Sequence, residues 1–99
     1  DSLKKLGIQH AIYTHPLGVY GHAPGPTIGM WDNQGPTIGR GDWPLHPMTG
    51  YAIEGNVVVR VPEWNNQRVQ MKLEQSALFD GNTVHYLAER QKALHVIGF

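Results

Sequence analysis

The alternation of apolar and polar residues is strongest between Tyr51 and Val61. Apolar side chains occupy one set of alternate positions, namely Tyr51, Ile53, Val57, Val59 and Val61. The other set holds Ala52, Glu54, Asn56, Val58 and Arg60. Because successive side chains of a β-strand point to opposite faces, this period of two predicts a strand with one mainly apolar and one more polar face.

Shorter segments with the same period lie on both sides of this strand. Residues 8–14 alternate before it, and residues 68–74 alternate after a turn at 62–66. Asp80-Gly81 is a strong two-residue turn signal, so we expect a hairpin here. Its arms would be residues 77–79 and 83–87.

The chain opens with what reads as the last turns of a helix, over residues 1–6. Lys4 and Lys5 suit the negative end of the helix dipole, and Gly7 suits the left-handed position after a helix. Such a short segment suggests a longer helix that has been cut, and the alternative is a short complete helix with Ser2 as its N-cap. Residues 89–94 fit either a short helix or a tail. The expected fold class is therefore α+β, a mostly antiparallel β-sheet with a short N-terminal helix remnant.

A long stretch rich in Gly and Pro, residues 16–48, separates the first two predicted strands. Irregular segments of this length inside a compact domain are usually functional. The stretch repeats a pentapeptide, Gly25–Gly29 and Gly35–Gly39. Two copies are too few for a repeat architecture, so we expect two similar turn-and-strand pieces.

Composition limits the function classes. The 99 residues make one domain at most, or a piece of one, spanning 1–99. The formal net charge is zero and no basic block occurs, which argues against nucleic acid as a partner. The absence of Cys excludes disulfides and thiolate chemistry. The longest apolar runs, such as 57–59, are far shorter than the roughly 20 residues of a membrane span, so we expect a soluble chain of unknown compartment.

Two carboxylates on neighbouring predicted strands, Glu54 and Glu74, are the best candidates for chemistry. Fixed anionic oxygens on adjacent strands suit hard or borderline divalent cations. Glu54 shares its face with Ala52 and Val58, so its charge needs a partner. The alternatives are a salt bridge from Glu54 to an arginine (Arg60 or Arg68) and a solvated face for Glu74.

Among six histidines, His15 and His22 stand out. His15 precedes Pro16 at a chain turn, and His22 follows a glycine where the backbone can approach a ligand. Either imidazole can donate to a carbonyl or an oxyanion, although loop histidines are most often only solvated. None of the six has a tight metal spacing such as His-x-His. Ser2 and Ser76, the two serines, lie outside any nucleophile motif.

Four segments in order, 14–18, 21–29, 51–54 and 72–75, resemble the C-terminal half of the pita-bread metallopeptidases. These are the family of methionine aminopeptidase, prolidase and Xaa-Pro aminopeptidase, and the resemblance covers nearly all of the chain. It implies the C-terminal half of a pita-bread fold and a metal-dependent hydrolase that cleaves amide bonds of small peptides. The family holds two divalent ions, often Mn, Co or Zn, with two Asp, one His and two Glu.

Matched residue by residue, the resemblance implies metal roles for Glu54 and Glu74. It gives Glu54 a catalytic role in proton transfer and His22 a catalytic role at the oxyanion. His15, His22 and Asn33 are the expected substrate-binding residues, with Asn33 at a position where the family has a histidine.

The chain departs from the family pattern at several positions. The family's metal-binding histidine falls on Pro26, Gly55 replaces a Pro, and Gln75 replaces an Asp. The two Asp ligands would lie upstream of residue 1. We therefore expect a fragment whose partner is either its missing N-terminal half or a second copy in a homodimer. The alternatives are a non-catalytic binding module or pseudoenzyme that keeps the cleft, and a small cupin-like barrel.

Overall fold

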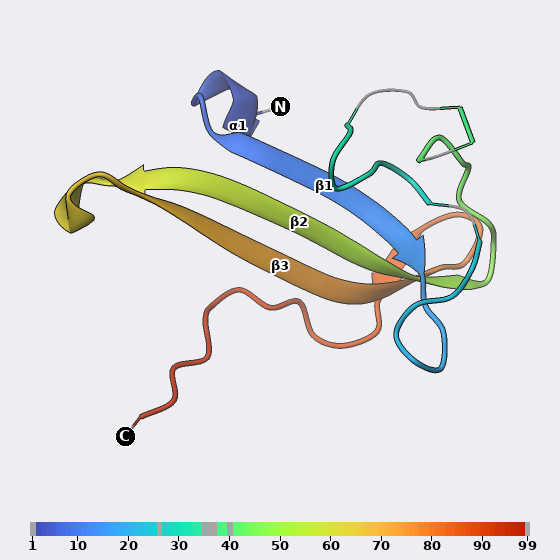
Figure 1. Cartoon of the computed structure of the whole chain (residues 1–99). Helices are drawn as coiled ribbons and strands as arrows, with labels where there is room; N and C mark the ends of the chain where they lie inside the picture. Colours follow the sequence, from blue (N-terminus) through green and yellow to red (C-terminus); the bar gives the residue numbers. More distant parts are fainter. Residues whose placement is uncertain (1, 26, 35–37, 40, 99) are drawn as a thin grey trace.

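The computed structural model describes residues 2–25, 27–34, 38–39 and 41–98 (Figure 1). They form one antiparallel sheet whose four strands follow one another in chain order. Its elements are helix α1 (Ser2–Lys5), strand β1 (Gln9–Pro16), strand β2 (Thr49–Val61), the 3-10 turn η1 (Pro62–Trp64), strand β3 (Gln67–Phe79) and strand β4 (Val84–Tyr86). The expectation of a mostly antiparallel sheet with one short helix is confirmed. Neither described helical segment is long and apolar enough to cross a bilayer.

The structure differs from the predicted end of the third strand, and it decides between the alternatives given for residues 89–94 and for the sheet. The sequence predicts a break after residue 74, but β3 continues to Phe79 because 74–76 pair in register with 52–54 of β2. Residues 89–94 form a tail without a helix. The sheet is open, with β1 and β4 as its outer strands, so it is not a cupin-like barrel.

The long connection between β1 and β2 lies against the outer edge of β1 (Figure 1). Thr14 and Ile28 exchange backbone hydrogen bonds of 2.8 and 3.2 Å, and Ile28 also bridges to Asp42. Gly29 follows with φ +70, and a Cβ there would lie 2.7 Å from the carbonyl oxygen of Ile12. Only glycine fits this close approach. The second copy of the pentapeptide falls partly on residues 35–37, which lie outside the described residues.

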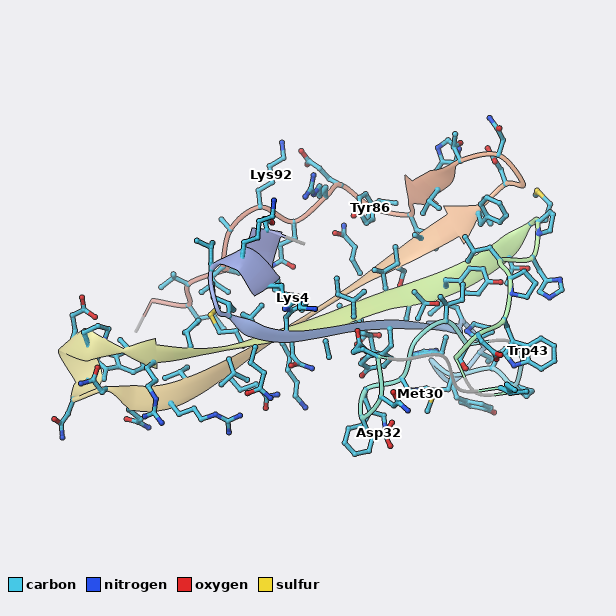
Figure 2. All side chains as sticks on the ribbon, turned by 90° about the horizontal axis from the view of Figure 1, so that it is seen from above. Lys4, Met30, Asp32, Trp43, Tyr86 and Lys92 are labelled. Carbon is cyan, nitrogen blue, oxygen red and sulfur yellow. The ribbon has the colours of Figure 1, made fainter. Side chains whose placement is uncertain are left out.

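Strand register divides the side chains between two faces of the sheet. One face carries polar groups from three strands, whereas the other is largely apolar. Figure 2 shows Met30, Asp32 and Trp43 of the long connection on one side of the sheet. Lys4 of α1, together with Tyr86 and Lys92 near the C-terminal end, lies on the other side. Different segments of the chain therefore lie over parts of the two faces.

The buried core is small for a chain of this size. Among the described residues, the buried hydrophobic side chains are those of Ala11, Tyr51, Ala52 and Ala77. The solvent-accessible surface is 8073 Å², whereas a folded monomer of this mass exposes about 5,600 Å². The radius of gyration is 15.7 Å, against about 13 Å for a compact domain of equal length. Ile12 and Leu73 of the apolar face remain 56% and 60% exposed.

The β3–β4 turn is held by the carboxylate of Asp80. Its Oδ1 accepts from the backbone N–H groups of Asn82 and Thr83 at 2.7 and 2.8 Å, and Oδ2 lies 2.8 Å from Nε2 of His85. The Thr83 and Asn82 hydrogen bonds, followed by that of His85, lower the pKa of Asp80 well below its usual range. The turn is therefore stabilised above the ordinary pKa of Asp, and this contribution is lost as the pH falls through the lowered pKa.

We expect Asp80→Ala to speed amide hydrogen exchange at residues 82 and 83, because both N–H groups lose their acceptor. Asp32→Ala, in an exposed loop, should leave both rates unchanged. Exchange measured by NMR near neutral pH checks this. Equal rates in the Asp80 variant and the wild type would show that the carboxylate does not hold the turn.

Candidate functional site

Strand pairing brings the two predicted carboxylates together. Glu54 of β2 and Glu74 of β3 are direct partners in register, so their side chains leave the same face of the sheet. Tyr13 of β1 pairs with Glu54 from the other side. The alternative of a salt bridge from Glu54 to an arginine is wrong. Within the described part of the chain, Arg60 donates to the carbonyl of Asn66 and Arg68 to the side chain of Gln9.

Both oxygens of the Glu54 carboxylate have a close neighbour from β1. Its Oε1 lies 2.8 Å from Nε2 of His15, and its Oε2 accepts a hydrogen bond of 2.5 Å from the Tyr13 hydroxyl. The carboxylate is largely buried, as is the imidazole. Tyr13 and His15 reach the same carboxylate because they are two residues apart and therefore share one face of β1.

The hydrogen bond at the far side of His15 decides which nitrogen carries the proton in the neutral ring. Nδ1 lies 2.9 Å from the carbonyl oxygen of Pro16. A carbonyl only accepts, so Nδ1 must donate and Nε2 is left with a lone pair. Nε2 is buried and forms no well-oriented hydrogen bond with any described residue, although it lies 2.8 Å from the Glu54 oxygen. A lone pair and a carboxylate oxygen at this separation require a cation or a proton.

His22 joins this pair from the loop that follows β1. Its ring stacks on that of His15, with centroids 4.2 Å apart and planes inclined by 17°. One ligand atom from each of His15, His22 and Glu54 lies within 4.8 Å of the others. Two imidazole nitrogens and one carboxylate oxygen form a ligand set that suits zinc and related divalent metals.

Glycine at position 18 allows the loop to place His22. The loop is closed by backbone hydrogen bonds of 3.0 Å from Ala23 to Pro16 and from Gly21 to Gly18. A Cβ on Gly18 would lie 2.6 Å from the carbonyl oxygen of His22 and 3.1 Å from the Cβ of Ala23. The backbone at His22 must therefore move if residue 18 carries a side chain.

If the cluster of His15, His22 and Glu54 holds a metal ion, Gly18→Ala should weaken Co²⁺ binding roughly tenfold by displacing His22, which is the scale of other changes that disorient a ligand. Gly98→Ala is the matched control, because a Cβ there meets nothing within 4 Å. Titration by isothermal calorimetry, with His ring signals followed by NMR, measures both effects. An unchanged affinity together with unchanged His22 signals would contradict the role of Gly18.

Tyr13 remains a hydrogen-bond donor at neutral pH. Its hydrogen bond to Glu54, its partial burial and the charges of Glu54 and Glu74 raise the pKa of its hydroxyl to about 12. The protonated hydroxyl fixes one oxygen of Glu54 in place. In metal sites, hydrogen bonds from surrounding residues orient the ligating carboxylates in the same way.

Two cavities meet at Glu54. A pocket of about 260 Å³ is lined by His15, His22, Glu54 and Trp31, among others. A larger groove of about 660 Å³ runs along the polar face of the sheet, and its lining also includes Tyr13, Trp31 and both carboxylates. A molecule held at Glu54 therefore has room on both sides.

The structure brings some of the predicted site residues together and places others elsewhere. His15, His22 and Glu54 form one cluster, and Glu74 shares its face and its groove. Asn33 instead lies in a turn closed by reciprocal backbone hydrogen bonds with Met30. Pro26, matched to the family's metal-binding histidine, lies outside the described residues. Their roles as metal, catalytic and substrate-binding residues stay predictions.

Sequence reasoning missed the contacts of Tyr13 and His15 with Glu54. It ended the first strand at residue 14 and treated His15 as a turn residue. The signal was present, since the alternation that places Ala11 and Tyr13 on one side reaches His15 after two more residues. Trp31 lines both cavities, whereas the sequence left open whether its tryptophans line a cleft or, as is more common, pack in the core or at its rim.

Comparison of the chain with models of protein families, with curated proteins and with solved structures finds no match.

Proposed function

We propose that this chain carries a divalent-metal site of a hydrolase that cleaves amide bonds of small peptides. The ligands in this proposal are His15, His22 and Glu54, with Glu74 as a further carboxylate on the same face. The observation that carries it is the buried Nε2 of His15, which lies 2.8 Å from a Glu54 oxygen and in one cluster with a ring nitrogen of His22. A divalent cation bound by both atoms would remove their repulsion and give each a ligand role.

The residues fit such an ion by type and by number. Catalytic zinc sites commonly use three protein ligands, two His and one Glu among them, and leave a further position open. Mn²⁺ and Co²⁺ accept the same mixture of imidazole and carboxylate. When bound, the metal supplies Lewis acidity that polarises a carbonyl and activates water.

The chain's own residues orient the ligands and receive the substrate. The carbonyl of Pro16 holds the His15 ring in the tautomer whose Nε2 is free to bind. Tyr13 fixes Oε2 of Glu54 by donating to it. Glu74 pairs with Glu54 in register and has no hydrogen-bond or ion-pair partner among the described residues. In this proposal it accepts a proton or binds a second ion.

The proposal includes the C-terminal half of a pita-bread fold, as the resemblance implies. An open sheet with its carboxylates on one face and a partly exposed apolar face on the other agrees with half of a larger fold. The partner that completes it is either an N-terminal half or a second copy of this chain.

The direct test is to titrate Co²⁺ into the chain, because its visible spectrum reports both ligand type and stoichiometry. We expect about one ion per chain, with a spectrum typical of mixed nitrogen and oxygen ligands. Hydrolysis of Xaa-Pro peptides is measured in parallel, with and without an N-terminal half of the family added. Failure to bind Co²⁺, Mn²⁺ or Zn²⁺ under both conditions would refute the proposal.

A further inference from the structure

Arg68 closes one end of the 660 Å³ groove. Its side chain leaves β3, crosses above β2 and donates from Nη2 to Oε1 of Gln9 on β1 at 3.0 Å. The groove therefore has a guanidinium at one end and the carboxylates of Glu54 and Glu74 at the other.

The cations at this end lack acidic partners within the described residues. Arg60 is the direct register partner of Arg68, and like charges opposite each other on a sheet repel. Each arginine donates only to a neutral oxygen, that of Asn66 or that of Gln9. Lys72, on the same face, has no ion pair among the described residues. Several N–H donors of each guanidinium are thus left for an anion.

The length of the groove limits what can span it. Gln9 pairs with Val58, four residues along β2 from Glu54, which places the two ends about 13 Å apart at the usual rise of a strand. An extended peptide of about four residues has the same length. Asn56 and Lys72 pair midway, where they can hydrogen-bond to a peptide backbone.

We infer that the groove binds an unblocked peptide of about four residues, with its terminal carboxylate on Arg68. This inference rests on the proposed function, since it places the amide bond to be cleaved beside Glu54. A carboxylate takes two parallel N–H bonds from a guanidinium, so Arg68 selects peptides with a free C-terminus. A dipeptide is too short to reach both ends.

The test compares tetraalanine as free acid and as C-terminal amide, by calorimetry at low salt. We expect the free acid to bind about fivefold to tenfold more tightly, because it alone makes charge-assisted hydrogen bonds. Arg68→Gln should remove this preference and Arg68→Lys should keep part of it. Arg90→Gln, the same change at a residue that does not line the groove, should leave it intact. Dialanine, which reaches only one end of the groove, should bind more weakly than tetraalanine.

Equal binding of acid and amide by the wild type, no binding of either, or a preference that survives in Arg68→Gln would overturn the inference. Co²⁺ titration of the wild type and of Arg68→Gln separates this outcome from failure of the proposed function. Co²⁺ binding without the acid preference rejects the inference alone. The acid preference without Co²⁺ binding rejects the metal site alone.

Discussion

Replacing Glu54 by Gln is expected to lower the affinity of the chain for Co²⁺ by roughly a hundredfold or more. The loss exceeds the 10- to 100-fold that follows from changing an outer residue, because the substitution removes the anionic ligand itself. The fold should persist, since the amide oxygen still accepts from Tyr13 and the amide N–H can donate to the lone pair on Nε2 of His15. We therefore expect Glu54→Gln to hold or raise the melting temperature of the metal-free chain.

Glu63→Gln is the matched control, because Glu63 lies exposed in η1, in the turn between β2 and β3. It should change neither metal affinity nor melting temperature. If Glu54→Gln binds Co²⁺ as tightly as the wild type, His15 and Glu54 do not share an ion. The same variant separates an enzyme from a pseudoenzyme. An enzyme loses turnover, whereas a binding module keeps its affinity for peptide.

The strands were predictable where the side-chain period is regular. The 13 residues of β2 contain the predicted segment 51–61 whole, because its apolar face alternates almost without interruption. Residues 74–76 of β3 are all polar, so the pattern stops there although the strand continues. Pairing with β2 extends the strand through these residues, and Ala52 is fully buried opposite Ser76.

The site was predictable only in part, because the sequence does not fix the register between β1 and β2. The predicted hairpin places Glu54 and Glu74 on adjacent strands. The length of its turn then sets the register in which the two residues pair directly. The neighbours of Glu54 on β1 did not follow, because 32 residues separate β1 from β2 and no local turn fixes how the two strands align. The His15–His22 stack depends on the conformation of the intervening loop, which side-chain period does not encode.

The apolar face of the sheet contributes to an unusually large exposed surface, since Ile12, Met71 and Leu73 are each at least 40% exposed. The chain exposes 8073 Å², about 2,500 Å² more than a compact monomer of its mass. A stable interface takes about 800 Å² from each partner. Met71 and Leu73 on β3 are exposed on this face, and the C-terminal tail, held by a hydrogen bond from Gln75 to the carbonyl of Glu89, leaves them partly open to solvent.

We therefore expect the chain on its own to associate through this face, with a mass by light scattering at least twice 11.0 kDa. Leu73→Lys should shift it toward the monomer, because it places a charge where the partner packs. Gln70→Lys is the matched control, since it adds the same charge to the opposite face of the same strand. If the proposed fold holds, an N-terminal half of a pita-bread metallopeptidase added in excess should compete for the face and replace the second copy. A monodisperse 11.0 kDa wild type would show that the face needs no cover.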